Sequence, residues 1–162
     1  MSREYLSRRG TRYHRISPGS IYESMVQSLV EQNAESLFPE FECRLTDPYF
    51  ETAAGNVQPD LVLIGRDEHV WGLVEVESED HSARGHVQPQ LAKLGYARAE
   101  GRARKQILEA FADLDLEHLE RSLSGRPSVF LVTHGSTPVT SDDLRALTVH
   151  SINVSIYRGS AN

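Results

Sequence analysis

The stretch QPDLVLIGRDEHVWGLVEVESED, residues 58–80, decides the fold because it encodes two strands and the turn between them. The apolar run that follows Pro59-Asp60 is unbroken, as is typical of a strand buried on both faces, and it predicts a strand over Pro59–Ile64. The segment GRDEH is short enough for a hairpin, and alternating residues predict the second strand over Val70–Glu77. We therefore expect the two strands to pair antiparallel.

Antiparallel pairing brings the start of the first strand close to the end of the second, and carboxylates occupy both of these ends. Asp60 opens the first strand, and Glu75 and Glu77 end the second. Because strand side chains alternate, Glu75 and Glu77 share the face that Trp71 and Leu73 extend toward the core. Carboxylates this close repel one another, and hard oxygen ligands suit Mg²⁺ or Mn²⁺. The pattern is also compatible with a solvated strand end, because the acidic run continues as ESED.

The rest of the chain predicts one α/β domain over residues 20–162 that follows a basic N-terminal arm, residues 1–19. The expected elements are an amphipathic helix over 20–37, a strand over Phe41–Leu45, the two strands above, a helical segment over Pro89–Leu123 with a bend at Gly101, a strand over Ser128–His134, a short helix over Ser141–Leu147 and a strand over Ile152–Arg158. The order α-β-β-β-α-β-α-β predicts a mixed β-sheet flanked by helices.

Composition narrows the class of protein further. The 162-residue chain has a formal net charge of −6, which argues against a protein that coats nucleic acid through bulk charge. Cys43 is the only cysteine, so an internal disulfide and a multi-cysteine zinc site are excluded. The sequence contains neither an apolar run of the roughly 20 residues that a membrane helix needs nor a secretory signal. We expect a cytoplasmic protein without a membrane partner.

Basic residues are concentrated in two segments despite the negative total. The residues that could contact the phosphates of DNA are Arg8, Arg9, Arg12 and Arg15 in the arm, and Arg98, Arg102, Arg104 and Lys105 near mid-chain. The same clusters are compatible with a solubilising tail and a solvated helix face, so the sequence leaves both interpretations open.

The run PDLVLIG…LVEVES resembles the PD-(D/E)XK nuclease superfamily, which has the restriction-endonuclease-like fold. In that family a Pro-Asp opens one strand and an acid-X-Lys triplet closes the next; Pro59-Asp60 and Glu75-Val76 match these positions. The family's element order also matches residues 20–134. The resemblance implies a restriction-endonuclease-like core in which Asp60, Glu75 and the carbonyl of Val76 hold Mg²⁺ or Mn²⁺.

Glu77 departs from the family pattern because it stands where the motif has lysine. Some restriction enzymes of the superfamily carry glutamate at this place, so the resemblance implies a metal-dependent deoxyribonuclease in which Glu77 orients or activates water. The alternative is a catalytically inactive module that binds DNA or protein within a larger complex. The family also includes many homodimers, and we expect either a homodimer or a subunit of a larger assembly.

Two further site residues follow from the resemblance. A glutamate of the first helix often reaches the metal site, which points to Glu23, although Ser20 and Glu23 also have the spacing of a capping box. RecB-like members have a glutamine and a tyrosine four residues apart; Gln90 and Tyr96 have the wrong spacing, so only Gln90 is carried over. The histidines His81, His86 and His134 are expected to lie on the surface.

Overall fold

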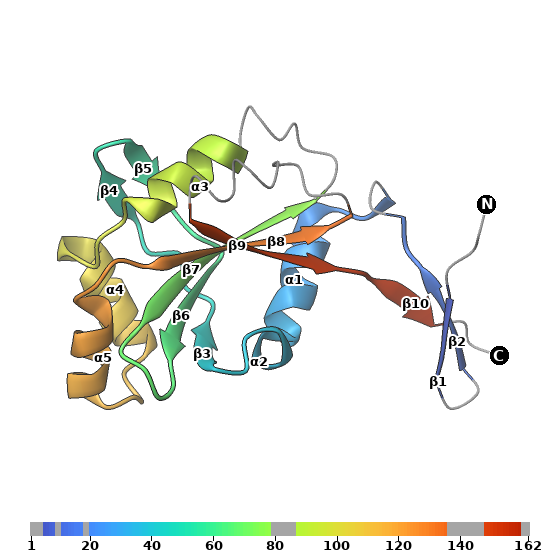
Figure 1. The fold of residues 1–162 in the computed structure, drawn as a ribbon, viewed down its shortest axis with the longest axis horizontal. Coiled ribbons are helices and arrows are strands. Elements are labelled where there is room, and N and C mark those ends of the chain that lie inside the picture. Colours follow the sequence, from blue (N-terminus) through green and yellow to red (C-terminus); the bar gives the residue numbers. More distant parts are fainter. Residues whose placement is uncertain (1–4, 9–10, 18–19, 79–86, 136–147, 160–162) are drawn as a thin grey trace.

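The computed structural model describes residues 5–8, 11–17, 20–78, 87–135 and 148–159, and it is an α/β structure (Figure 1). The described chain forms a five-stranded mixed sheet in the order β3-β6-β7-β8-β9. These strands are β3 (Phe41–Arg44), β6 (Leu61–Gly65), β7 (Trp71–Ser78), β8 (Ser128–His134) and β9 (Val149–Val154).

Helices cover both faces of this sheet (Figure 1). One face carries α1 (Glu23–Gln32) and α2 (Ala34–Leu37), and the other carries α3 (Val87–Gly95), α4 (Gly101–Ala110) and α5 (Leu116–Leu123). Within the described ranges, no helix is long and apolar enough to cross a membrane.

The strand pairing confirms the predicted antiparallel pair and extends it to a three-stranded meander. β6 and β7 are antiparallel, with Leu61 opposite Val74 and Ile64 opposite Trp71, and β3 is antiparallel to β6. β8 and β9 then join in parallel. All residues of β6 and β7 are buried, as the apolar run of β6 predicted, because helices lie on both faces of these strands.

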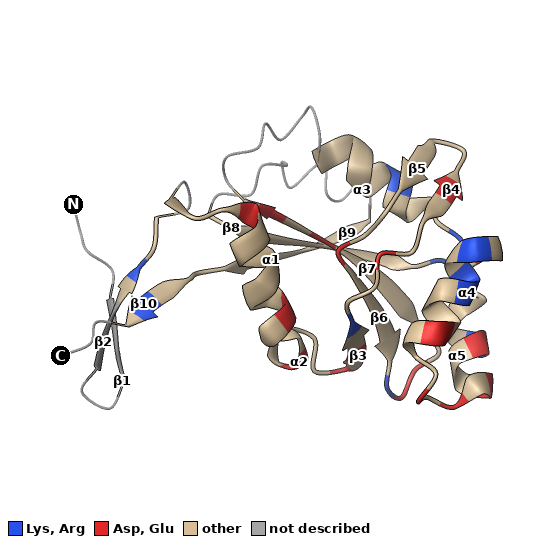
Figure 2. Cartoon of the chain, turned by 180° about the vertical axis from the view of Figure 1, so that it is seen from behind, with Lys and Arg blue, Asp and Glu red and all other residues tan. Residues whose placement is uncertain are grey.

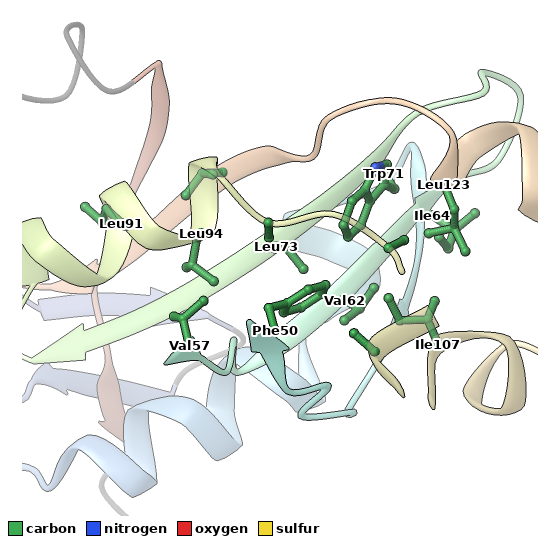
Figure 3. Close-up of a cluster of buried hydrophobic side chains, with 14 of the residues drawn as sticks. Phe50, Val57, Val62, Ile64, Trp71, Leu73, Leu91, Leu94, Ile107 and Leu123 are labelled. Atoms are coloured by element: carbon green, nitrogen blue, oxygen red, sulfur yellow. The ribbon is translucent and has the colours of Figure 1, made fainter. Parts of the chain in front are cut away.

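Strand alternation divides the core into two layers. Val62, Ile64, Trp71 and Leu73 face α3, α4 and α5, where Leu91 and other residues complete one layer (Figure 3). Leu61, Leu63, Val74 and Val76 face α1 in a second layer with Val26 and Val30. The indole of Trp71 donates a hydrogen bond to the Gly125 carbonyl at 3.1 Å, so its polar atom is satisfied within the first layer.

The helices are more divided than the sequence predicted. The segment predicted over Pro89–Leu123 forms three helices, with Pro89 in the first turn of α3 and Gly101, at a φ of 50°, opening α4. The second break, before α5, was not predicted. Asp115 caps α5 by accepting a hydrogen bond from the His118 N–H at 2.8 Å. The first helix likewise divides into α1 and α2 at Asn33.

Two small sheets were not predicted from the sequence. The segment expected as a loop contains the hairpin β4 (Phe50–Thr52) and β5 (Gly55–Val57), in which Gly55 has a φ of 111°. Within residues 1–19, β1 (Tyr5–Arg8) pairs with β2 (Thr11–Arg15), and β2 also pairs with β10 (Tyr157–Gly159). This three-stranded sheet lies apart from the main sheet (Figure 1).

The last predicted strand also differs from the structure. Its residues divide between β9 and β10, because Ser155 and Ile156 leave the main sheet before β10 joins β2. The short helix predicted over Ser141–Leu147 lies outside the described residues.

Gly72 in the central strand β7 is required by close packing. A Cβ atom there would lie 2.8 Å from Cε2 of Phe130 on β8. The Phe130 ring has little freedom to move, because Phe38 and Phe41 contact it edge-on at centroid distances of 5.5 Å and 5.8 Å. Glycine at this position therefore leaves room for the Phe130 ring, against which Phe38 at the end of α2 and Phe41 of β3 pack.

We expect Gly72→Ala to lower the free energy of unfolding by about 1–3 kcal/mol, because the new methyl group overpacks this contact. Thermal and urea unfolding of the purified variant measure the change. Gly95→Ala is the matched control, since an added Cβ at the end of α3 meets no atom within 4 Å. Equal stability of Gly72→Ala and wild type would contradict the packing argument.

Candidate carboxylate site

Asp60 is held against the end of β7 by the backbone. Its N–H donates to the Val74 carbonyl at 2.9 Å, and its Oδ2 accepts a hydrogen bond from the Val76 N–H at 2.7 Å. The side chain therefore reaches across the hairpin to the residue between Glu75 and Glu77. The register that the apolar strands impose brings Asp60 to this position, as the sequence predicted.

Glu75 and Glu77 are buried on the face of β7 that α3 covers. Each is 6% exposed, which is low for an acidic side chain. The Gln90 amide on α3 donates to Oε1 of Glu75 at 3.0 Å. The other oxygen, Oε2, is buried and has no hydrogen-bond partner in the described part of the chain. Thus Gln90 lies in the site, as the sequence proposed, while Tyr96 at the far end of α3 is 60% exposed.

Helix α1 adds an acid and an amide to the same place. Its first turn carries Glu23, whose charge acts on both Asp60 and Glu75. One turn later, the Gln27 amide donates to Oδ1 of Asp60 at 3.0 Å. Figure 2 shows the acidic start of α1 close to the acidic end of β7. Gln27 was missed from the sequence, although its spacing of four residues from Glu23 places both on one side of the helix.

The capping box that Ser20 and Glu23 were expected to form is absent. Tyr22 is the residue at the N-cap of α1, and it makes no side-chain capping bond. Ser20 directs both its N–H and its hydroxyl to the Ser17 carbonyl, at 3.0 Å and 2.7 Å. The capping role therefore does not explain Glu23, and its position next to the carboxylates supports the other interpretation.

Burial and mutual repulsion raise the pKa values of two of these acids. Loss of solvation is the largest cause of the rise in the pKa of Glu75 to about 9, and the charges of Asp60 and Glu77 add to it. Burial is also the main reason that the pKa of Asp60 rises to about 6, although the Val76 N–H lowers this pKa and Glu23 and Glu31 raise it. The metal-free fold thus favours a protonated Glu75 at neutral pH.

An open cleft of about 420 Å³ borders the Asp60 side of the site. Asp60 and Gln27 form part of its lining, together with residues 45–47, Gln58 and Pro59. The lining is mostly polar or exposed, apart from Pro59. The cleft gives a bound molecule a route to Asp60 at the joined ends of β6 and β7.

The oxygen-rich site has the donor chemistry of a hard divalent cation. Asp60, Glu75 and Glu77 supply carboxylates, and no described residue hydrogen-bonds the buried Oε2 of Glu75. In the described part of the chain, however, no three Asp, Glu, His or Cys side chains already have the arrangement of ligands around one ion. Ion binding therefore requires these side chains to draw together from their metal-free positions.

The mid-chain basic residues fall into two groups. Arg104 pairs with Glu120 at 3.1 Å and Lys105 with Glu109 at 3.8 Å. Arg98 and Arg102 are exposed and make no ion pair within the described ranges. Figure 2 shows the basic residues of α4 away from the acidic end of β7.

Three arginines of the N-terminal segment lie in strands of the small sheet. Arg8 is in β1, and Arg12 and Arg15 are in β2, whereas Arg9 lies outside the described residues. This sheet contains Arg158 as well, opposite His14 in β10.

The prediction that His134 lies on the surface is wrong. Its side chain is fully buried at the end of β8, and its Nδ1 hydrogen-bonds the Val154 carbonyl of β9 at 3.1 Å. The parallel strand β9, which covers this end of β8, accounts for the burial. His81 and His86 lie outside the described residues.

Comparison with known proteins adds no information about this site, so its geometry is the evidence for what it does. No family model, curated protein or solved structure matches the chain.

We expect Glu75→Gln to stabilise the metal-free protein at pH 8. Because the pKa of Glu75 in the folded protein, about 9, exceeds its ordinary value of 4.5, the folded state binds more protons than the unfolded chain between these values. The free energy of unfolding then falls as pH rises through this window. Neutral glutamine cannot ionise, so the variant does not lose this stability. We expect Glu75→Gln to exceed wild type in free energy of unfolding by about 1–3 kcal/mol at pH 8, and by close to zero at pH 4.5.

Thermal unfolding with EDTA at the two pH values measures this effect. Glu68→Gln is the control, because Glu68 is an exposed acid in the turn at the opposite end of the same hairpin. If Glu75→Gln and wild type have the same pH dependence, the buried carboxylate does not carry the proposed repulsion.

Proposed function

We propose that this chain is a metal-dependent nuclease with a restriction-endonuclease-like core, which hydrolyses the phosphodiester bonds of DNA. The observation that carries the proposal is the convergence of Asp60, Glu75 and Glu77 at the joined ends of β6 and β7. The resemblance of these residues to the PD-(D/E)XK motif supports it, as does the helix–meander–helix–strand order of the fold.

The electrostatics of the site favour a function over a structural role. Burying acids beside one another destabilises the folded protein, and it does so most where the carboxylates are ionised. An apolar core needs no such cluster. A divalent cation offsets the repulsion, and when bound it polarises the scissile phosphate and makes its water more acidic.

Each residue near the cluster has a role in the proposed reaction. Asp60, Glu75 and the Val76 carbonyl hold Mg²⁺ or Mn²⁺. Glu77 orients the attacking water and accepts its proton as the water oxygen attacks phosphorus, and the leaving oxygen of the broken P–O bond takes up a proton from solvent.

The surrounding polar residues keep the carboxylates in place. Gln90 positions Glu75 by donating to Oε1, and Gln27 positions Asp60 by donating to Oδ1. Glu23 adds negative charge at the edge of the site, which strengthens cation binding.

Arginines would bind the DNA backbone around this centre. Arg98 and Arg102 are available for phosphate contacts because they make no ion pair in the described structure. Arg104 and Lys105 would have to exchange Glu120 and Glu109 for phosphates. In the terminal sheet, Arg8, Arg12 and Arg15 are carried on paired strands. Two paired strands can lie along a DNA groove.

A binding module that lacks catalysis is the second candidate. It is favoured by Glu77, which replaces the lysine of the motif, and by the absence of a preformed ligand set among the described residues. In that case the acidic end of the hairpin would be retained for docking rather than for chemistry. Metal binding separates the two candidates.

Replacing Glu75 by alanine is expected to abolish nicking of a supercoiled plasmid in Mg²⁺ or Mn²⁺, because a metal ligand is lost. Asp60→Asn is expected to have the same effect, with activity reduced by at least about 100-fold, which corresponds to about 2.8 kcal/mol. Gel assays measure nicking, and calorimetric titration with Mn²⁺ measures metal binding. Glu68→Gln is the control for loss of an acid away from the site and should remain active.

The outcomes distinguish the candidates sharply. Full activity in Glu75→Ala would refute the assignment of the site. Absence of both metal binding at millimolar Mn²⁺ and cleavage in wild type would favour the binding module.

We expect the double variant Arg98→Ala/Arg102→Ala to reduce the salt dependence of DNA binding. Each phosphate contact contributes about 0.9 to the slope of log affinity against log salt for duplex DNA, so the slope should become shallower by about 1–2. Fluorescence anisotropy in EDTA measures the slope without cleavage. The matched double variant Arg104→Ala/Lys105→Ala removes the same charge from paired residues and should change the slope less; equal slopes for both variants would contradict the distinction.

A further inference from the structure

Thr133 lies beside the carboxylates but has no counterpart in the motif that identifies them. It is opposite Glu77 in the parallel pairing of β8 and β7, and therefore on a neighbouring strand at the usual spacing of about 4.8 Å. Strand alternation places Thr133 with Leu131 and Val129 on the face that α3 covers. Glu75 and Glu77 occupy this same face.

The hydroxyl of Thr133 is buried without a hydrogen-bond partner. The residue is 1% exposed, and its Oγ1 has no hydrogen-bond partner among the residues that the structure describes. A buried hydroxyl in that condition costs about 1–3 kcal/mol. Ser122 on α5 shows the ordinary solution, since its equally buried hydroxyl donates to the His118 carbonyl at 2.9 Å.

A structural role does not explain this threonine. Valine has the same shape, suits a buried strand at least as well and carries no polar atom to desolvate. The neighbours Val132 and Val129 show that this strand accepts valine. No described residue supplies the partner that this hydroxyl needs, which leaves room for a bound species to supply it.

Glu75 provides a second atom with the same requirement. Its Oε2 is buried and lacks a hydrogen-bond partner, and it lies on the same sheet face, two residues from Glu77. The two oxygens without a partner, Oε2 of Glu75 and Oγ1 of Thr133, lie on adjacent strands, and Glu77 is the residue of β7 opposite Thr133. This arrangement indicates a bound species that contacts both oxygens. A cation with its water molecules meets this requirement, because it satisfies carboxylate and hydroxyl oxygens together.

We propose that Thr133 belongs to the carboxylate site and that its hydroxyl holds the divalent cation, directly or through one water molecule. This inference rests on the proposed metal site and adds β8 to the elements that build it. β6 then supplies Asp60, β7 supplies Glu75 and Glu77, and β8 supplies a neutral oxygen that adds no further charge repulsion.

The test compares Thr133→Val, which removes the hydroxyl at constant shape, with Thr133→Ser, which keeps it. Calorimetric titration with Mn²⁺ is expected to show affinity weakened by about 10-fold or more in Thr133→Val, as for other residues that support metal ligands. Thr133→Ser should stay within about threefold of wild type. Thermal unfolding supplies a readout independent of activity: Thr133→Val should be as stable as wild type or more stable in EDTA, yet gain less stability from Mn²⁺.

The control Ser122→Ala removes a buried hydroxyl away from the carboxylates. It should lower stability in EDTA and leave Mn²⁺ affinity unchanged. If Thr133→Val fails to fold, Thr133→Ala provides the same comparison, because it removes the hydroxyl without adding an atom.

The failure of this inference differs from the failure of the proposed function. Wild type that binds no Mn²⁺ would overturn both. Wild type, Thr133→Val and Thr133→Ser that bind Mn²⁺ equally would overturn the role of Thr133 and leave the metal site standing.

Discussion

The hydrogen bond from the Val76 N–H to the Asp60 carboxylate is the contact on which the site depends. It forms because the register of β6 and β7 places Leu61 opposite Val74, so that the residue before β6 meets the end of β7. A shift of one residue in the register of β7 would turn Glu75 and Glu77 to the α1 face. It would also turn each apolar side chain of β7 toward the opposite layer of the core. The apolar alternation that builds the core therefore also determines where the acids lie.

Burial gives these acids their chemical character. Helices on both faces leave little water around the end of β7, and the pKa of Glu75 rises for that reason above all. Gln90 and Gln27 offset part of the cost by donating to Glu75 and Asp60, but Oε2 of Glu75 and the hydroxyl of Thr133 have no partner. Stability is thus lost at one end of an otherwise apolar sheet, and the cation that we propose would offset that loss.

Element boundaries outside the main hairpin were predicted less well, for identifiable physical reasons. The helical spacing of residues 89–123 is nearly continuous, and the backbone breaks where Gly101 adopts a positive φ and Asp115 caps a new helix. β4 and β5 have three residues each, too few for alternation to be recognised. β2 pairs with β10, which is almost the whole chain away in sequence, and β1 pairs only with β2.

The sequence by itself determined the antiparallel hairpin, the shared face of Glu75 and Glu77, and the approach of Asp60, because strand alternation and a short turn are local properties. Only the tertiary structure decided that Gln27 contacts Asp60, that Gln90 contacts Glu75, that His134 is buried and that Thr133 lies beside Glu77. Each of these facts joins segments far apart in the chain. The distances between these residues depend on how helices and strands pack across the sheet, which no local sequence pattern specifies.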